Sequence, residues 1–201
     1  NSNTLYQYGF DKYEISQNTG LGSTELTKAA QGLIDYFNSD EELISLTVIK
    51  DGQPFELFSE REIIHLKDVK DLFELDYIIL LFTALYALIY LVISLIRRRK
   101  EQLLSLARSA LIGSGITLSL MTALGIGILI DFDRLFEQFH LLSFSNDFWK
   151  LNPHTDYLIM LFPENFWYDT AILCVGLMVA GALLLGLSGW LYLRQQKEGR
   201  R

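Results

Sequence analysis

The chain has 201 residues, half of them hydrophobic, with three prolines and a formal net charge of −7 at pH 7. This composition excludes a disordered chain, and 17 basic against 24 acidic residues leave no basic footprint for nucleic acid, so no nucleic-acid partner is expected. The single cysteine, Cys174, lies in an apolar run, which excludes an extracellular disulfide and a four-cysteine metal site.

Residues 1–76 form the first predicted domain, which carries 15 acidic and 6 basic side chains. Apolar residues at helical spacing predict a helix over about 24–38, with Ser23 or Thr24 as its N-cap. Moderate alternation over 43–49, the turn signal Asp51-Gly52 and a renewed apolar stretch at 54–58 predict a short antiparallel strand pair. The domain is therefore expected to be a small α+β cap.

A second helix of this domain is predicted to begin after Ser59. Ser59 and Glu62 have the spacing of a capping box, in which the N-cap and the third helical residue satisfy each other's polar groups. The helix carries His65, and its apolar periodicity runs on toward Tyr77. His65 is then expected about three turns above the point where the chain enters a membrane.

Three apolar runs, at 77–96, 109–130 and 170–193, are each close to the roughly 20 residues that cross a hydrocarbon core. Residues 97–108 hold five bases and one acid, and 194–201 hold four and one, so both are predicted to be cytoplasmic. The N-terminal domain and the acidic loop 131–169 are then extracytoplasmic in a multi-pass protein of the cell membrane. Because that domain has no visible means of export and the chain begins Asn-Ser, we expect a fourth, N-terminal hydrophobic segment to be missing.

The loop 131–169 is rich in aromatic residues. Its first part has the pattern of an amphipathic helix lying in the membrane interface, and His140 follows on the apolar side. Aromatic belts are typical of the headgroup layer, but they do not explain the polar residues among them, which are Ser145, Asn146, Asp147, His154, Asp156 and Glu164.

Four segments of the chain resemble Lit, the lipoprotein intramolecular transacylase family of Gram-positive bacteria. They are Glu60–Lys70, Phe139–Trp149, Asp156–Ile159 and Phe162–Phe166, and the likeness extends over nearly the whole chain. The resemblance implies transfer of the sn-2 acyl chain of a lipoprotein's S-diacylglyceryl cysteine to the α-amino group of that cysteine. It implies diacylglyceryl-modified lipoproteins and membrane lipid as partners. We expect no cofactor, no metal and no required protein partner.

This aminolysis requires a proton to move from the amine to the departing glycerol oxygen. Histidine can accept and donate protons at neutral pH, so His65 and His140 are the candidate catalytic pair, without assignment of acid and base. Candidates to orient them or to stabilise an oxyanion are Arg61, Asp68, Asn146, Asp147 and Asp156. The predicted wall for acyl chains contains Phe139, Phe144, Phe148 and Trp149.

Other interpretations remain open at this point. Ser143 or Ser145 could form an acyl-enzyme with His140, and His65, His140 and a carboxylate could bind a metal ion. His154 is typical of an exposed turn, and Glu62 of a capping residue. The alternative from another functional class is a non-enzymatic membrane anchor whose exported domain binds an envelope partner. Convergence of His65 and His140 would favour the enzyme. The expected architecture is a small helical bundle with the α+β cap outside, open sideways to lipid.

Overall fold

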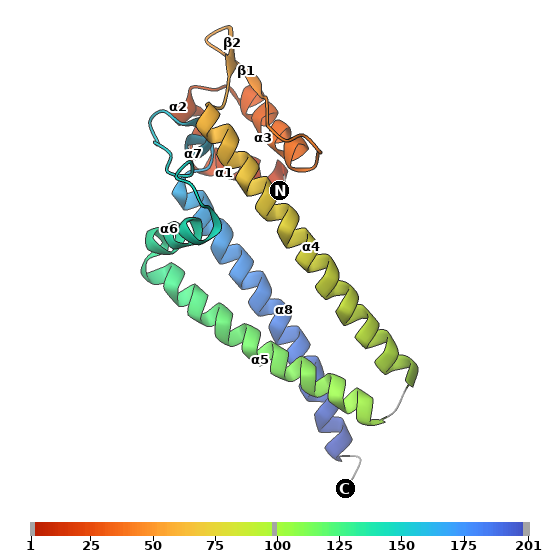
Figure 1. The fold of residues 1–201 in the computed structure, drawn as a ribbon. Coiled ribbons are helices and arrows are strands. Elements are labelled where there is room, and N and C mark those ends of the chain that lie inside the picture. The colour runs from red at the N-terminus through yellow and green to blue at the C-terminus, as the bar shows by residue number, and fades with distance from the viewer. Residues whose placement is uncertain (1–2, 98–99, 199–201) are drawn as a thin grey trace. The chain divides into compact units, whose positions relative to one another are not determined.

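The structure, a computed structural model, describes residues 3–97 and 100–198, and it is mainly helical (Figure 1). The contacts between residues divide the chain into two compact units. Unit 1 comprises Asn1–Leu75 and Phe136–Tyr168, and unit 2 comprises Asp76–Leu135 and Asp169–Arg201. Each unit therefore combines segments that are far apart in sequence.

Unit 1 is a small α+β assembly around one apolar core. It contains α1 (Asn3–Lys12), α2 (Ile15–Thr19), α3 (Ser23–Phe37), β1 (Thr47–Lys50), β2 (Gln53–Glu56) and α7 (Tyr157–Leu161). It also includes the first turns of α4 (Glu60–Arg97), most of α6 (Phe132–Ser143) and the start of α8 (Glu164–Glu198). The helical spacing of buried residues on α3, at Leu26, Ala30 and Leu33, is the reason that this helix packs on the core.

The helix predicted over 24–38 is α3, but its predicted cap was wrong. Gly22, in an extended conformation, occupies the N-cap position, and no side chain caps the helix. Ser23 is instead the first helical residue, because the Gly22 carbonyl already accepts the first intrahelical hydrogen bond, from Leu26 N. Glycine is an acceptable N-cap, so the serine is not needed there.

The predicted hairpin is present, with Lys50 paired to Gln53 across a two-residue turn. Asp51 and Gly52 have φ angles of 52° and 78°, and two positive φ values are what a type I′ turn requires. The first strand is shorter than the predicted 43–49, since a strand extends only where a partner lies beside it and β2 has four residues. The Glu25 carboxylate accepts a hydrogen bond from Ile49 N at 2.7 Å and so ties the hairpin to α3.

Glu62 forms its half of the predicted capping box at the start of α4, whereas the Ser59 hydroxyl donates to the same carboxylate. Glu62 Oε2 accepts hydrogen bonds from Ser59 N at 2.8 Å and Ser59 Oγ at 2.7 Å. Its other oxygen accepts one from Leu158 N at 2.7 Å, and the side chain is only 1% exposed. One buried carboxylate therefore joins the start of α4 to α7, which the sequence did not predict.

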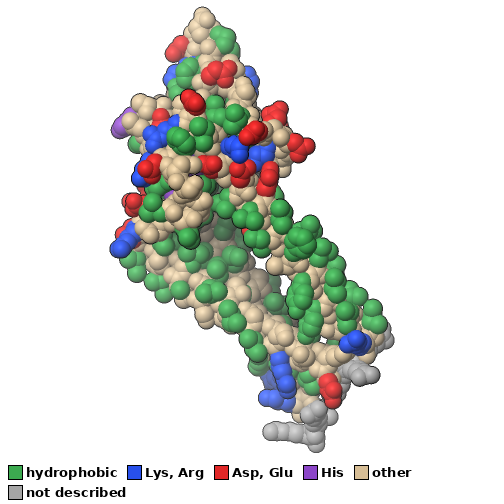
Figure 2. All heavy atoms as spheres, viewed as in Figure 1, with side chains coloured by type: hydrophobic (Ala, Val, Ile, Leu, Met, Phe, Trp, Pro, Cys, Tyr) green, Lys and Arg blue, Asp and Glu red, His purple; other side chains and the backbone are tan. Residues whose placement is uncertain are grey.

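Unit 2 is built from α5 (Lys100–Ile130) and the long apolar parts of α4 and α8. These three helices are long and apolar enough to cross a membrane, which confirms the predicted fold class. Their apolar side chains stay exposed, as for Phe82 at 68% and Ile130 at 78%, and Figure 2 shows hydrophobic side chains covering them. Exposed apolar surface of this extent is suited to lipid rather than water. Charged side chains gather over unit 1 in the same view.

Close packing within unit 2 occurs at Gly189 of α8. A Cβ atom at this position would lie 2.7 Å from the backbone oxygen of Ala107 on α5, closer than a side chain tolerates. A small residue here lets the two backbones approach, as is common between helices in membranes.

Candidate active site

His65 and His140 lie together in unit 1. His65 is on the second turn of α4 and His140 is near the end of α6, and they are only 6% and 7% exposed. The centroids of the two imidazole rings are 5.9 Å apart, with an angle of 37° between the ring planes. The structure therefore brings together the two histidines that were predicted to converge.

The His140 ring is held by a backbone carbonyl. Its Nδ1 lies 2.7 Å from Phe136 O, and because a carbonyl can only accept, Nδ1 must carry the proton. In the neutral ring the lone pair is then on Nε2. Burial lowers the pKa of His140, and the bond to Phe136 opposes this in part. His140 is thus an uncharged imidazole at neutral pH, with a basic nitrogen at Nε2.

His65 is in a less polar setting. Within the described residues its Nδ1 has no hydrogen-bond partner, and this atom is buried. Burial, with a smaller contribution from the neighbouring His140, lowers the pKa of His65 to about 4, although Asp68 acts in the opposite direction. Both histidines are consequently neutral at pH 7, which is the form that can accept a proton.

Aromatic side chains surround the two imidazoles. The Phe144 ring lies 5.1 Å from that of His65 and 5.6 Å from that of His140. Trp149 lies 4.9 Å from His140 with 30° between the planes, and Phe139 lies 5.3 Å from His140, edge to face. Phe148 is 37% exposed, and its backbone N–H is bonded to Asn146. Three of the four predicted wall residues therefore contact the histidine pair.

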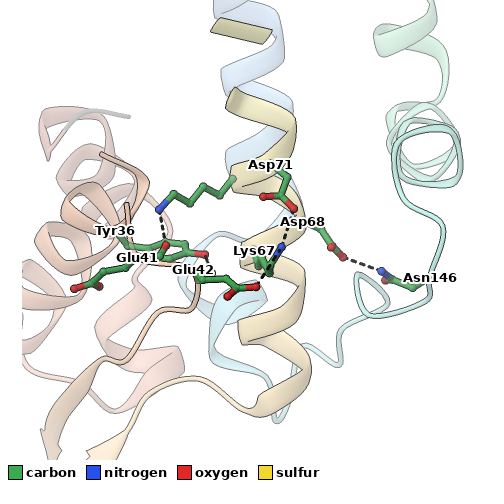
Figure 3. A network of polar contacts seen from close by, with 8 residues as sticks. Tyr36, Glu41, Glu42, Lys67, Asp68, Asp71 and Asn146 are labelled. Carbon is green, nitrogen blue, oxygen red and sulfur yellow. Dashed lines mark hydrogen bonds and ion pairs between the residues drawn. The ribbon is translucent and has the colours of Figure 1, made fainter. Parts of the chain in front are cut away.

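Polar residues predicted to support the histidines instead hold the 144–149 loop against α4. Asn146 Nδ2 donates to Asp68 Oδ2 at 2.8 Å, as Figure 3 shows, and Asn146 Oδ1 accepts from Phe148 N at 3.0 Å. Arg61 donates to the backbone oxygen of Asp147 at 2.7 Å. These bonds fix the loop that carries Phe144 and Trp149, so they act on the site through position.

The other acidic candidates shape the loop itself. The Asp147 carboxylate pairs with Lys150 at 2.7 Å and is largely exposed. The Asp156 carboxylate accepts hydrogen bonds from Asn152 N at 2.7 Å and from Thr155 at 3.1 Å. Neither orients His140, whose Nδ1 is already bonded to Phe136. His154 is exposed, as expected of a turn residue.

Two alternatives from the sequence can be compared with this geometry. Nδ1 of His140 bonds a backbone carbonyl rather than the hydroxyl of Ser143 or Ser145, and Ser145 is exposed. Among residues 3–97 and 100–198, no group of three or more His, Cys, Asp or Glu side chains is placed to hold a metal ion.

Comparison with known proteins identifies the family. Residues 1–167 match the sequence profile described as lipoprotein intramolecular transacylase Lit. The chain belongs to the Lit family. A solved structure of membrane-integral Lit from Bacillus cereus superposes with a TM-score of 0.73 at 27% identity, covering 96% of this chain and 84% of that one. A second structure of that protein, with a histidine-to-arginine mutation, gives a TM-score of 0.68 at 26% identity, covering 98% and 82%.

A curated relative from Aquifex aeolicus, described as an uncharacterized protein, is 31% identical over 141 residues. That match covers 68% of this chain, which spans only 60% of the length of the relative. Membership of the Lit family therefore rests on the profile, and the geometry above gives the chemistry that this particular chain can offer.

Sequence reasoning missed two features of this part of the structure. The first is the hydrogen bond from His140 to the Phe136 carbonyl. Every residue inside a helix has a carbonyl four positions before it, so the sequence cannot show which side-chain rotamer forms such a bond. The second is the reach of Glu62 to Leu158, which no local pattern encodes.

Proposed function

We propose that this chain is a lipoprotein intramolecular transacylase that moves the sn-2 acyl chain of an S-diacylglyceryl cysteine to the cysteine α-amino group. The product is an N-acyl, S-monoacylglyceryl lipoprotein, the lyso form. Membership of the Lit family and three helices of membrane-spanning length support this assignment. The observation that carries it is the pair of buried, neutral histidines with rings 5.9 Å apart.

The reaction needs little beyond positioning and one proton transfer. The amine nitrogen attacks the carbonyl carbon of the sn-2 ester, a carbon–nitrogen bond forms, and the carbon–oxygen bond to glycerol breaks. The amine loses one proton and the glycerol oxygen gains one, so no water is consumed. Nucleophile and electrophile belong to one substrate molecule, and alignment of such groups can give effective molarities of roughly 10⁵ to 10⁸ M.

The histidines supply the proton transfer. His140 accepts the amine proton at Nε2, because its Nδ1–H is committed to the Phe136 carbonyl. His140 then passes this proton to the neighbouring ring of His65, and His65 gives it to the departing oxygen, so that both rings return to the neutral form. The lowered pKa of His65 makes its protonated form a strong donor. Acid–base groups in such positions typically contribute about 10²- to 10⁴-fold in rate.

The lipid setting follows from the surface of α6. Leu142 is 90% exposed, Leu141 is 51% exposed, and Phe139 beside His140 is 48% exposed. Apolar side chains in this number suit a helix that lies in the membrane interface.

With the basic segments 97–108 and 194–201 cytoplasmic, unit 1 faces the outer leaflet, where a diacylglyceryl lipoprotein is anchored. The acyl chains then lie against Phe139, Phe144 and Trp149, with Phe148 at the edge.

The test is mass spectrometry of a lipoprotein N-terminus from cells that express the wild-type chain or a single variant. The wild type is expected to give the N-acyl lyso product, and His65→Ala and His140→Ala are expected to lose it. His154→Ala is the matched control, because His154 is an exposed histidine of the same unit, and it should behave as wild type. If both His65→Ala and His140→Ala still give the product, the proposed proton transfer by the two histidines is wrong. If the folded wild-type chain gives no N-acyl lyso product, the chain is instead a non-enzymatic binding module.

A further inference from the structure

Most hydrogen-bond donors near the histidine pair are already engaged. Asn146 donates to the Asp68 carboxylate, Arg61 donates to the Asp147 carbonyl, and His140 Nδ1 donates to the Phe136 carbonyl. Asn146 and Arg61 were among the side chains that the sequence offered for an oxyanion, and the structure gives both a role in fixing the loop.

The indole nitrogen of Trp149 is different. Among the described residues, Nε1 of Trp149 is buried and has no hydrogen-bond partner, and the ring lies 4.9 Å from that of His140. An indole N–H can only donate, and a buried donor without an acceptor costs free energy that native proteins rarely tolerate. Such a group in a folded protein calls for an explanation, of which a catalytic role is one.

A second unpartnered atom lies in the same aromatic cluster, His65 Nδ1. His65 and Trp149 are linked through His140, whose ring contacts both. The cluster therefore holds one nitrogen that can only donate and one imidazole nitrogen that can accept. Aminolysis of an ester needs a donor for the oxygen that becomes negative, in addition to the proton transfer assigned to the two imidazoles.

We propose that Trp149 is a catalytic residue whose Nε1–H donates a hydrogen bond to the carbonyl oxygen of the sn-2 ester. This inference rests on the proposed transacylase function. When the amine attacks, the carbonyl electron pair moves onto that oxygen, and it returns to reform the carbonyl as the bond to glycerol breaks. Trp149 neither gains nor loses a proton, and it stabilises the charge only while the charge exists.

The surroundings of Trp149 support such a role. Its ring lies against that of His140 with 30° between the planes, and the Lys150 ammonium lies over the ring, 5.2 Å from its centroid. The loop before it is bonded to α4 through Asn146 and Asp68. A donor held in this way needs little rearrangement during the reaction, which is the condition under which an oxyanion contact is most effective.

The first experiment compares purified full-length wild type with Trp149→Phe, using a synthetic dipalmitoylglyceryl-cysteine peptide in detergent micelles. Phenylalanine keeps an aromatic ring and removes the N–H. The expected result is a fall in kcat of about 100- to 1,000-fold with KM changed less than threefold, as for loss of a single oxyanion donor. Trp190→Phe makes the same chemical change at a partly exposed residue of unit 2 and should keep the wild-type kcat.

A second measurement separates the N–H from the packing of the ring. Binding is measured for two probes in which the sn-2 ester is replaced, one by a phosphonate that carries the negative oxygen and one by an ether that lacks it. Trp149→Phe should weaken binding of the phosphonate by about 100-fold or more and leave binding of the ether unchanged. Binding of the ether also reports that the variant is folded.

The outcomes distinguish the two proposals. If the wild type is active and Trp149→Phe has a similar kcat, only the role of Trp149 is overturned. The same holds if Trp149→Phe loses affinity equally for both probes. A folded wild type that yields no N-acyl peptide overturns the transacylase function itself.

Discussion

The buried, neutral state of His65 makes the stability of this protein depend on pH in a defined direction. Burial, with a contribution from His140, lowers its pKa to about 4, against about 6.5 in an unfolded chain. Between these values the unfolded state binds more protons than the folded state, so folding stability falls as the pH falls from 6.5 toward 4. The loss from this residue between pH 7 and pH 5 is about 2 kcal/mol, or about 20-fold in the folding equilibrium.

The assay is equilibrium unfolding in mixed detergent micelles at pH 7 and pH 5, for wild type and for His65→Gln, which removes the titrating ring. The wild type should lose about 2 kcal/mol more than the variant over this interval. His154→Gln changes an exposed histidine and should follow the wild type. If wild type and His65→Gln lose the same stability, the ring is not buried in its neutral form and the reasoning about the site is refuted.

Three further perturbations follow from single contacts. Both carboxylate oxygens of Glu62 accept hydrogen bonds, so Glu62→Gln turns one acceptor into a donor that faces another donor. This variant should lower the free energy of unfolding by about 1–3 kcal/mol. The control Glu60→Gln changes an exposed residue and should lower it by almost nothing. Asp68→Ala and Asn146→Ala should each lower kcat about tenfold, and a double variant no worse than either would show that the two share one interaction. Gly189→Ala should lower the thermal midpoint, because its Cβ would meet a backbone oxygen 2.7 Å away, and an unchanged midpoint would mean that α5 and α8 separate freely.

Several parts of the fold could be predicted because they depend on neighbours along the chain. Apolar runs of membrane-spanning length appear as α4, α5 and α8, and Asp51-Gly52 forms the hairpin turn through positive φ angles. The Glu62 half of the Ser59 capping box also formed, since the two residues are three positions apart. The cap of α3 was missed because Gly22, Ser23 and Thr24 all suit that position, and sequence alone does not rank them.

The roles of the polar candidates show where local reasoning stops. From the sequence, Asp68 was a candidate to orient His65 and Asn146 a candidate oxyanion donor, but the structure pairs them with each other. Asp156 closes a turn with Asn152. A carboxylate near a histidine in sequence has many possible partners, and its direction is set by side-chain rotamers and by the path of the loop.

The sequence by itself determined the membrane-spanning helices and the hairpin, and it singled out His65 and His140 as candidates, because periodicity, turn chemistry and motif are written in consecutive residues. Only the tertiary structure decided that the rings of His65 and His140 lie together and that a backbone carbonyl fixes one of them. It also decided that the buried N–H of Trp149 has no partner among the residues that the structure describes. The physical reason is that burial and hydrogen-bond partnership depend on segments joined by folding, here the start of α4 and the 136–149 segment.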